Sequence, residues 1–191
     1  MVSKTREKLL EVARQLFVRK GLAHTTMNDI AAASDKGRRT IYTYFKSKRD
    51  IYNAVVERES DRHVQKMRLI AENKTLTPDR QLFEFLLTRY HPTNDPASKS
   101  LLSKLTIDIK RTERFRQLTY SKEQQLLETI LRRGVQQDIF DPEQTRRLQS
   151  FMGRWLMEID RASFTEPTAA VPDTENLNLI EFIVKGTLKN K

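Results

Sequence analysis

Cysteine is absent from the 191 residues of the chain, which also has only 5 glycines and 6 prolines. The missing thiols exclude a disulfide framework, a thiolate metal site and a cysteine nucleophile, and they fit a reducing compartment. So few glycines and prolines leave little material for the turns of a β-sandwich. An all-α fold is therefore expected.

Long apolar runs and catalytic signatures are also missing. No run of about 18 apolar residues could span a bilayer, and the first residues carry charges inside their apolar pattern, unlike a secretory signal. The simplest expectation is a cytoplasmic protein. No phosphate-binding loop, G-x-S-x-G, H-E-x-x-H or dinucleotide fingerprint occurs, so we expect neither an enzyme nor a cofactor.

The three histidines are His24, His63 and His91. They lack the paired spacing of metal ligands, so we expect no metal site. His63 is expected on an exposed turn of its helix. The many carboxylates alternate with Lys and Arg at helical spacing, which is typical of solvated helix faces.

The net charge of +10 is concentrated at one end of the chain. Residues 1–49 hold 12 Lys/Arg and 4 Asp/Glu, a net charge of +8, while the other 142 residues carry only +2. A basic segment joined to a nearly neutral one predicts polyanion binding by the first and a different task for the second. The alternative is a solvated basic surface. We place the expected domain boundary between residues 1–49 and 50–191.

Local signals predict three helices in the basic segment. Apolar side chains at steps of three and four predict a helix over 4–20, which Gly21 ends. Thr26 and Asp29 form a capping box before a second helix, 27–34. After a break at residues 35–37, helical character resumes over 38–45. The apolar stripe of the first helix consists of Leu9, Val12, Ala13, Leu16 and Phe17.

Cap and proline signals also divide the larger segment. Ser47 and Asp50 repeat the capping chemistry before a helix that runs to about residue 71. Pro78 and Pro142 each follow a capping side chain and predict helix starts. The remaining expected helices cover 79–90, 99–110, 113–139, 143–164 and 175–188, with loops over 91–97 and 165–174.

Two short helices after a longer one form the helix-turn-helix arrangement, in which the second short helix enters the major groove of DNA. That helix begins with Arg38 and Arg39, whose guanidinium groups fit guanine edges. The Thr26 cap leaves helix amides for a phosphate. Hydroxyl and ammonium groups suited to phosphates follow at Thr40, Tyr42, Tyr44, Lys46 and Lys48.

The same segment resembles the TetR family of transcriptional repressors. It carries Asp29-Ile30-Ala31, then the run TIYTYFKSK from Thr40, and Ile51. The resemblance covers about residues 8–56. It implies an all-helical, homodimeric, ligand-responsive repressor with a three-helix DNA-binding domain and a larger effector-binding and dimerising domain. By position, Thr26, Tyr42, Tyr44 and Lys48 match phosphate-contacting places, while Asn28, Arg38, Arg39 and Thr43 match places that face bases.

The turn departs from the family pattern. Where members commonly show Ala-Gly-Val-Ser, this chain has Ser34-Asp35-Lys36-Gly37. Glycine is an acceptable cap, only a few tenths of a kcal/mol poorer than serine, so the following helix should form. Three cations, Lys36, Arg38 and Arg39, could instead reach phosphates and give affinity with little specificity. Phosphate contact by the arginines therefore stays open beside base reading.

Two apolar stripes near the end of the chain fit the intersubunit four-helix bundle that the resemblance implies, and they fit an ordinary core equally well. A two-fold dimer would read a pseudo-palindromic operator in double-stranded DNA. The expected dimer residues are Leu148, Met152, Leu156, Ile159, Leu177, Ile180 and Val184.

A pocket for a small-molecule effector is expected inside the larger domain, and each candidate residue could equally be plain core. The candidates are Phe83, Leu87, Tyr90, Leu105, Phe115, Tyr120, Phe151 and Trp155. Two alternative functions remain: a nonspecific nucleic-acid-binding protein, and a helical small-molecule carrier or enzyme whose basic face is incidental.

Overall fold

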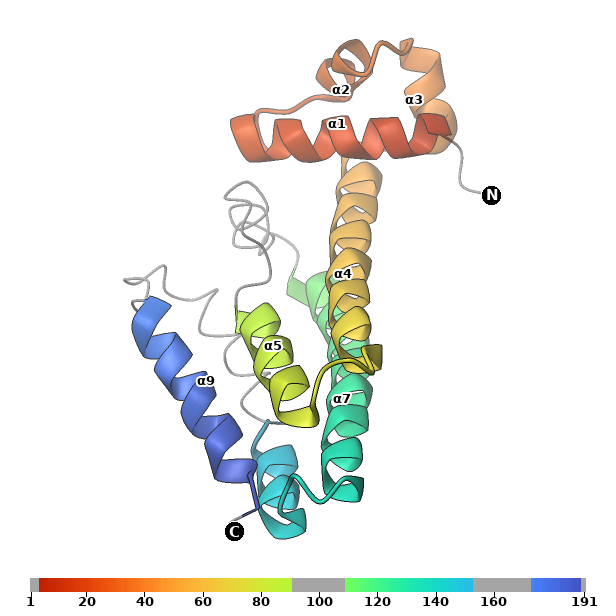
Figure 1. The fold of residues 1–191 in the computed structure, drawn as a ribbon. Coiled ribbons are helices and arrows are strands. Elements are labelled where there is room, and N and C mark those ends of the chain that lie inside the picture. The colour runs from red at the N-terminus through yellow and green to blue at the C-terminus, as the bar shows by residue number, and fades with distance from the viewer. Residues whose placement is uncertain (1–3, 91–108, 153–172, 190–191) are drawn as a thin grey trace. The chain divides into compact units, whose positions relative to one another are not determined.

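A computed structural model describes residues 4–90, 109–152 and 173–189 of the chain (Figure 1). These residues are helical, apart from turns and an isolated antiparallel bridge between Phe140 and Leu188. The all-α fold expected from the sequence is confirmed. In the described part of the chain, no helix combines the length and the apolar character that crossing a membrane requires.

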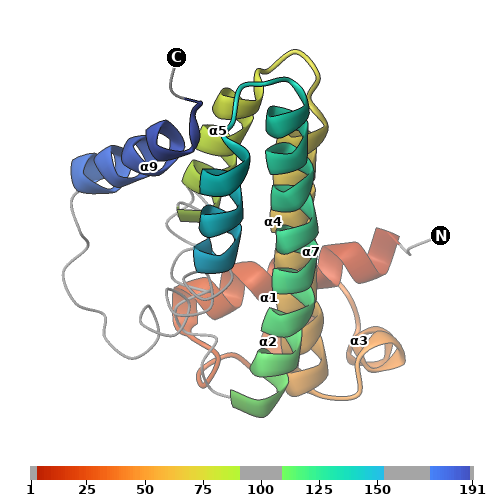
Figure 2. The same ribbon diagram turned by 90° about the horizontal axis from the view of Figure 1, so that it is seen from below.

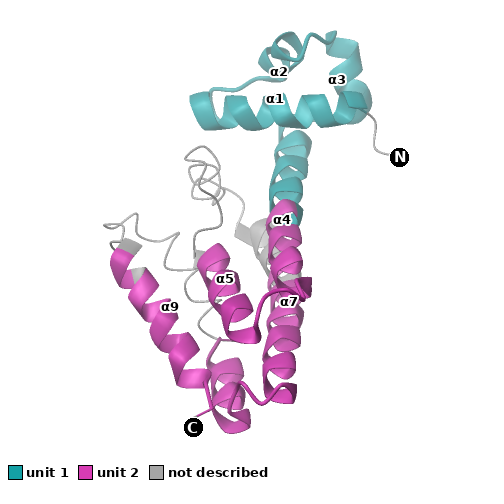
Figure 3. Cartoon of the chain, viewed as in Figure 1, with its two compact units in different colours: residues 1–61, 93–108 teal, residues 62–92, 109–191 magenta. Residues whose placement is uncertain are grey.

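The described chain divides into two compact units, which Figure 3 colours separately. The first unit contains α1 (Lys4–Lys20), α2 (Met27–Ala33), α3 (Arg38–Tyr44) and the beginning of α4 (Lys48–Glu72). The observed bounds differ from the expected ones by at most one residue, because caps and helix-ending residues act locally. The chain leaves α1 at Gly21, whose φ of +80° lies in the left-handed region that favours glycine.

A continuous apolar core holds the first unit together. Phe17, Ile30, Ile41 and Val55 are at most 2% exposed and come from all four helices. Because the start of α4 contributes side chains to this core, the first unit extends beyond the expected boundary after residue 49. Along α4, the first unit ends at Asp61.

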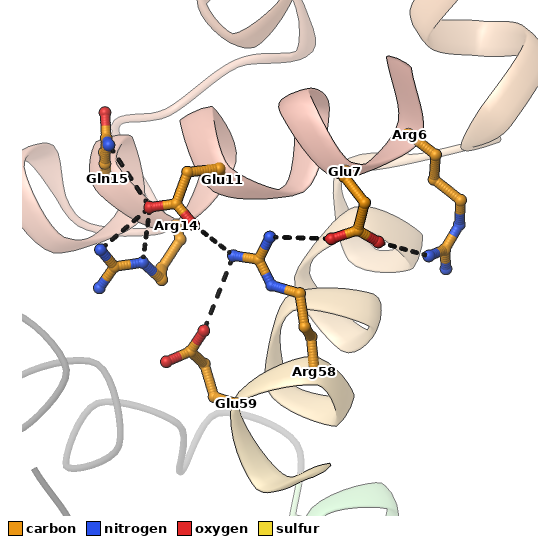
Figure 4. Close-up of polar contacts among 7 residues, drawn as sticks. All are labelled: Arg6, Glu7, Glu11, Arg14, Gln15, Arg58 and Glu59. Carbon is orange, nitrogen blue, oxygen red and sulfur yellow. Dashed lines mark hydrogen bonds and ion pairs between the residues drawn. The ribbon is translucent and has the colours of Figure 1, made fainter. Parts of the chain in front are cut away.

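Ion pairs add to this core between α1 and α4 (Figure 4). Arg58 on α4 has a side chain only 12% exposed, and its guanidinium lies 2.9 Å from Glu11 Oε2 and 3.5 Å from Glu7 Oε2. Glu59 is a third partner at 3.7 Å. Arg14 pairs with the other oxygen of Glu11 at 3.1 Å. One guanidinium thus fixes two successive turns of α1 to α4.

The second unit contains the rest of α4, α5 (Pro78–Tyr90), α7 (Ile109–Gln136), helical residues 142–152 and α9 (Asp173–Thr187). Helix α5 packs against both α7 and α9 (Figures 1 and 2). The expected break between residues 110 and 113 is wrong, since α7 runs continuously from residue 109. The expected helix over 99–110 lies, up to residue 108, outside the described residues.

A close contact ends α7 three residues earlier than expected. Gly134 lies against the ring of Phe140, and its carbonyl accepts hydrogen bonds from the amides of Ile139 and Phe140. Asp138 takes a φ of +59°, which turns the chain out of the helix. The loop then reaches the end of α9, where the Asp141 amide donates to the Thr187 carbonyl at 2.9 Å.

A buried glutamine closes the far end of α4. The Gln81 amide nitrogen donates to the carbonyls of Ile70, Ala71 and Asn73 at 2.8–3.0 Å. Its amide oxygen accepts from Arg133 of α7 at 3.1 Å. These bonds satisfy carbonyl groups that the last turn of a helix leaves without an intrahelical partner.

Candidate nucleic-acid interface

The turn between α2 and α3 is closed by backbone bonds despite its unusual sequence. The Lys36 amide donates to Ala31 O at 2.9 Å and the Asp35 amide to Ala32 O at 3.1 Å, the two bonds of a Schellman motif. The buried Ser34 hydroxyl also donates to Ala31 O, at 2.9 Å. Asp35 occupies the left-handed position with a φ of +54°, where glycine is usual.

Helix α3 has one buried and one exposed face. Gly37 caps it with extended backbone and no side-chain hydrogen bond. Ile41 is fully buried and anchors the helix in the core, whereas Tyr42 is 47% exposed. Arg38 and Arg39 in the first turn are both exposed. The helix therefore presents two guanidinium groups and a phenol to solvent.

Hydroxyls and cations continue this surface. Thr43 is exposed, and its hydroxyl donates to Arg39 O at 3.0 Å, so its oxygen is left mainly as an acceptor. Tyr44 is 36% exposed and Lys46 is exposed, while Thr40 and Lys36 are half-buried. The seven residues of α3 include no acid.

The start of α2 carries the expected capping box. Thr26 Oγ1 accepts from the Asp29 amide at 3.1 Å, and Asp29 Oδ2 accepts from the Thr26 amide at 2.9 Å. The backbone hydrogen bond from Thr26, followed by its side-chain bond, lowers the pKa of Asp29. Lys20 lies 3.9 Å away and offsets part of this negative charge. Thr26 and Asn28 are both exposed.

Lys48 differs from its neighbours. Its ammonium group donates to Leu22 O at 2.8 Å and to Ala23 O at 3.3 Å. The side chain is half-buried. The resemblance gives Lys48 a phosphate-contacting place, but here the ammonium group is engaged with the loop between α1 and α2.

The effector candidates do not form one cluster among the described residues. Phe83, Leu87 and Tyr120 lie at the edge of the core of the second unit, while Phe151 is 50% exposed. Burial raises the pKa of Tyr120, whose hydroxyl accepts from Gln124 Nε2 at 2.6 Å. The other candidates, Leu105 and Trp155 together with the side chains of Tyr90 and Phe115, lie outside the described residues.

Three of the expected dimer residues face the interior of the chain itself. Met152, Ile180 and Val184 are 0%, 1% and 8% exposed and belong to the core of the second unit. Their helical spacing describes the inward face of the chain, which agrees with the alternative of an ordinary core, and their place in a dimer interface stays a prediction. Leu148 and Leu177 are half-buried, and Leu156 and Ile159 lie outside the described residues.

Three large apolar side chains that are exposed in the second unit do not belong to the two apolar stripes predicted from the sequence. Phe182 is 74% exposed and Leu179 41%, and Phe151 adds to this surface. A groove of about 270 Å³ lies beside them. It is lined by Gln144, Arg147, Leu148, Phe151, Phe182, Ile183, Gly186 and Thr187.

The second unit contains a buried charge cluster that the sequence did not predict. Glu123 is only 2% exposed, and its carboxylate lies 3.2 Å from His63 Nε2 and accepts from Arg89 Nε at 2.9 Å. The exposed turn expected for His63 is therefore wrong. The expectation of solvated carboxylates fails for Glu123, because its partners are distant in the sequence and no local spacing signals them.

Together, the closed α2–α3 turn and the exposed arginines of α3 form a helix-turn-helix unit with basic surroundings, joined to a helical second unit. The comparisons with known proteins agree with this class. Residues 9–55 match the family model of the bacterial regulatory proteins of the tetR family. Over these residues the chain is similar to the TetR family.

Two curated relatives match over part of their length. The uncharacterized HTH-type transcriptional regulator YfiR of Bacillus subtilis (strain 168) is 32% identical over 73 residues, 38% of this chain and 36% of that protein. The probable acrEF/envCD operon repressor of Escherichia coli (strain K12) is 42% identical over 50 residues, 26% of this chain and 23% of that protein. The matched regions thus span about a third or less of these relatives.

A solved structure extends the likeness to the whole fold. The crystal structure of a transcriptional regulator from Cytophaga hutchinsonii superposes with a TM-score of 0.75 over 96% of this chain and 98% of that one. The identity is 20%, so the shared feature is the fold.

Proposed function

We propose that the protein is a non-enzymatic transcriptional repressor that binds a pseudo-palindromic operator through α3. The observation that carries this proposal is the two-faced helix: Ile41 holds it in the core while Arg38 and Arg39 stay exposed at its start. At this end of a recognition helix, a guanidinium group can donate two hydrogen bonds to the edge of a base in the major groove. A repressor of this kind would act in the cytoplasm, where we place the protein.

Binding-site selection from random duplexes tests this function. An enriched palindrome with two half-sites supports the repressor, whereas retention without any enriched sequence supports the nonspecific nucleic-acid-binding alternative. Contact with about six to ten phosphates lowers the affinity ~10³- to 10⁵-fold between 50 and 200 mM salt. An affinity that does not change with salt would reject the mechanism. Ligand turnover without sequence-selective DNA binding would favour the carrier or enzyme.

We also propose that a second copy of the chain covers the apolar surface of Phe151, Leu179 and Phe182. A dimer places two recognition helices on one operator, with half-sites about 34 Å or a multiple apart. Exposed aromatic side chains beside a groove are typical of an interface. Phe182→Ser should shift the chain toward monomer in sedimentation equilibrium. Leu69→Ser removes an apolar side chain that is 62% exposed elsewhere on the second unit and should leave the dimer unchanged.

A small-molecule effector would then release the repressor by binding more tightly to a conformation unsuited to the operator. We place its pocket in the second unit, near Phe83, Leu87 and Tyr120, at the edge of the core. Tyr120 offers an apolar ring and a polar hydroxyl at one place, the combination that lines small-molecule sites. A screen of metabolites and toxic compounds for operator release identifies candidates, and Tyr120→Phe should weaken release without weakening operator binding.

A further inference from the structure

Lys48 occupies a place where a cation is electrostatically unfavourable. It is the first residue of α4, and the amino-terminal end of a helix carries positive partial charge. A lysine there needs nearby negative partners. In this structure the partners are the two backbone carbonyls of Leu22 and Ala23, at 2.8 and 3.3 Å from Nζ. The contacts join residues more than twenty positions apart in the sequence.

Those carbonyls belong to the loop that carries the chain from α1 to α2. On its inner side, the fully buried Thr25 donates its hydroxyl to Gly21 O at 2.8 Å. On its other side, Lys48 binds Leu22 and Ala23. The next residue is Thr26, whose capping box begins α2. Lys48 therefore acts on the segment that sets where α2 starts.

We propose that Lys48 is a positioning residue: it holds the α1–α2 loop, and so the amino-terminal end of α2, and does not itself bind a DNA phosphate. The part about DNA rests on the proposed function, while the part about the loop does not. The neighbouring cation Lys46 is exposed, and the amide of Lys46, not its ammonium group, donates to Asp50. Lys46 is thus the matched residue for a direct phosphate contact.

The experiment compares Lys48→Met with Lys46→Met in the full chain. Each substitution removes one charge and keeps a long side chain. We expect Lys48→Met to speed hydrogen exchange of the Thr25 and Thr26 amides on the order of tenfold, because charge-assisted bonds to the loop are lost. Lys46→Met should leave this exchange unchanged. Lys48→Gln, which keeps a donor, should give an intermediate rate.

DNA binding supplies the second readout, measured as the slope of log affinity against log salt concentration on the selected duplex. This slope is negative, and loss of one phosphate contact reduces its magnitude by about 0.9. We expect that change for Lys46→Met, and an unchanged slope with weaker binding for Lys48→Met.

A slope whose magnitude falls by about 0.9 in Lys48→Met would make Lys48 a phosphate ligand and overturn the proposal. Unchanged exchange of the Thr25 and Thr26 amides in both Lys48 variants would overturn it as well. Absence of DNA binding by the unsubstituted chain would instead reject the proposed function, and the exchange rates would then decide the role of Lys48 in the loop.

Discussion

The ring of Phe140 lies against the backbone of Gly134, so close that any Cβ at position 134 would overlap it. Phe140 is 1% exposed and has little room to move. Gly134→Ala should therefore lower the free energy of unfolding by about 3 kcal/mol, at the upper end of overpacking costs. Urea denaturation at a fixed protein concentration measures this change.

Gly186→Ala is the control for that variant. Gly186 also lies in a helix, but nothing lies within 4 Å of an added Cβ. Replacing a helical glycine by alanine should raise the stability by about 0.5 to 1 kcal/mol. Effects of the same sign at the two glycines would contradict the packing argument.

Asp35 stands at the left-handed position that ends α2, with a φ of +54°. Asp35→Gly should raise the free energy of unfolding by about 1 kcal/mol, because glycine adopts this conformation without steric cost. Asp35→Ala removes the same carboxylate and keeps the strain, so it should not stabilise the fold. Thermal unfolding of the three proteins separates backbone strain from charge, and equal gains in both variants would assign the effect to charge.

Tyr52 packs its ring edge-on against Phe17, with 5.7 Å between the ring centroids. Its buried hydroxyl has no hydrogen-bond partner among the described residues, and burial raises the pKa of Tyr52 to about 12. Tyr52→Phe should be as stable as the original chain or about 1 kcal/mol more stable at neutral pH.

The raised pKa also predicts a pH dependence. The folded state binds the phenolic proton more tightly than the unfolded state, so this contribution is complete below pH 10 and is lost as the pH rises toward 12. Denaturation curves at pH 8 and pH 11 should differ more for the original chain than for Tyr52→Phe. Equal differences would show that Tyr52 does not titrate in this range.

Asp29 predicts the opposite dependence at acidic pH. Its pKa is lowered in the folded state by the hydrogen bonds from Thr26, so the stabilisation is present above the ordinary value of 3.8 and is lost as the pH falls through the lowered pKa. Asp29→Asn keeps an acceptor for the Thr26 amide but cannot titrate. Its unfolding free energy should fall less steeply below pH 4, as measured by denaturant titration at several pH values.

Arg38 and Tyr42 predict different kinds of loss in DNA binding. Arg38→Ala should cost ~1 to 3 kcal/mol mainly at one base position, and Tyr42→Phe should weaken all sequences similarly. Affinities for the selected operator and its single-base variants measure both. A uniform loss for Arg38→Ala would place Arg38 among the phosphate contacts.

Local chemistry explains why the first unit was predictable. The helix bounds follow from Gly21, the Thr26 capping box and the break at Asp35, all of which act within a few residues. The separation of Ile41 from the two arginines that precede it follows from helical periodicity. The family signature lies on this same segment, so the candidate DNA-binding surface was readable from sequence.

Tertiary geometry explains what the sequence did not reveal. Periodicity predicts that Met152 lies on one apolar helix face and Ile180 on another, but it does not say whether these faces meet their own chain or a partner. The pairing of Arg58 with Glu11 and that of Glu123 with His63 join positions 47 and 60 residues apart, and such pairs leave no spacing signal. Lys48 is recognisable as a cation in the sequence, but its carbonyl partners are not.

Two backbone hydrogen bonds attach the end of α9 to the loop after α7. Lys189 donates its amide to Ile139 O at 3.0 Å, and Thr187 accepts from Asp141. Disruption of these bonds would therefore loosen the carboxyl-terminal end of α9, the helix that displays Phe182. The loop after α7 thus helps to hold the surface that two copies are proposed to share.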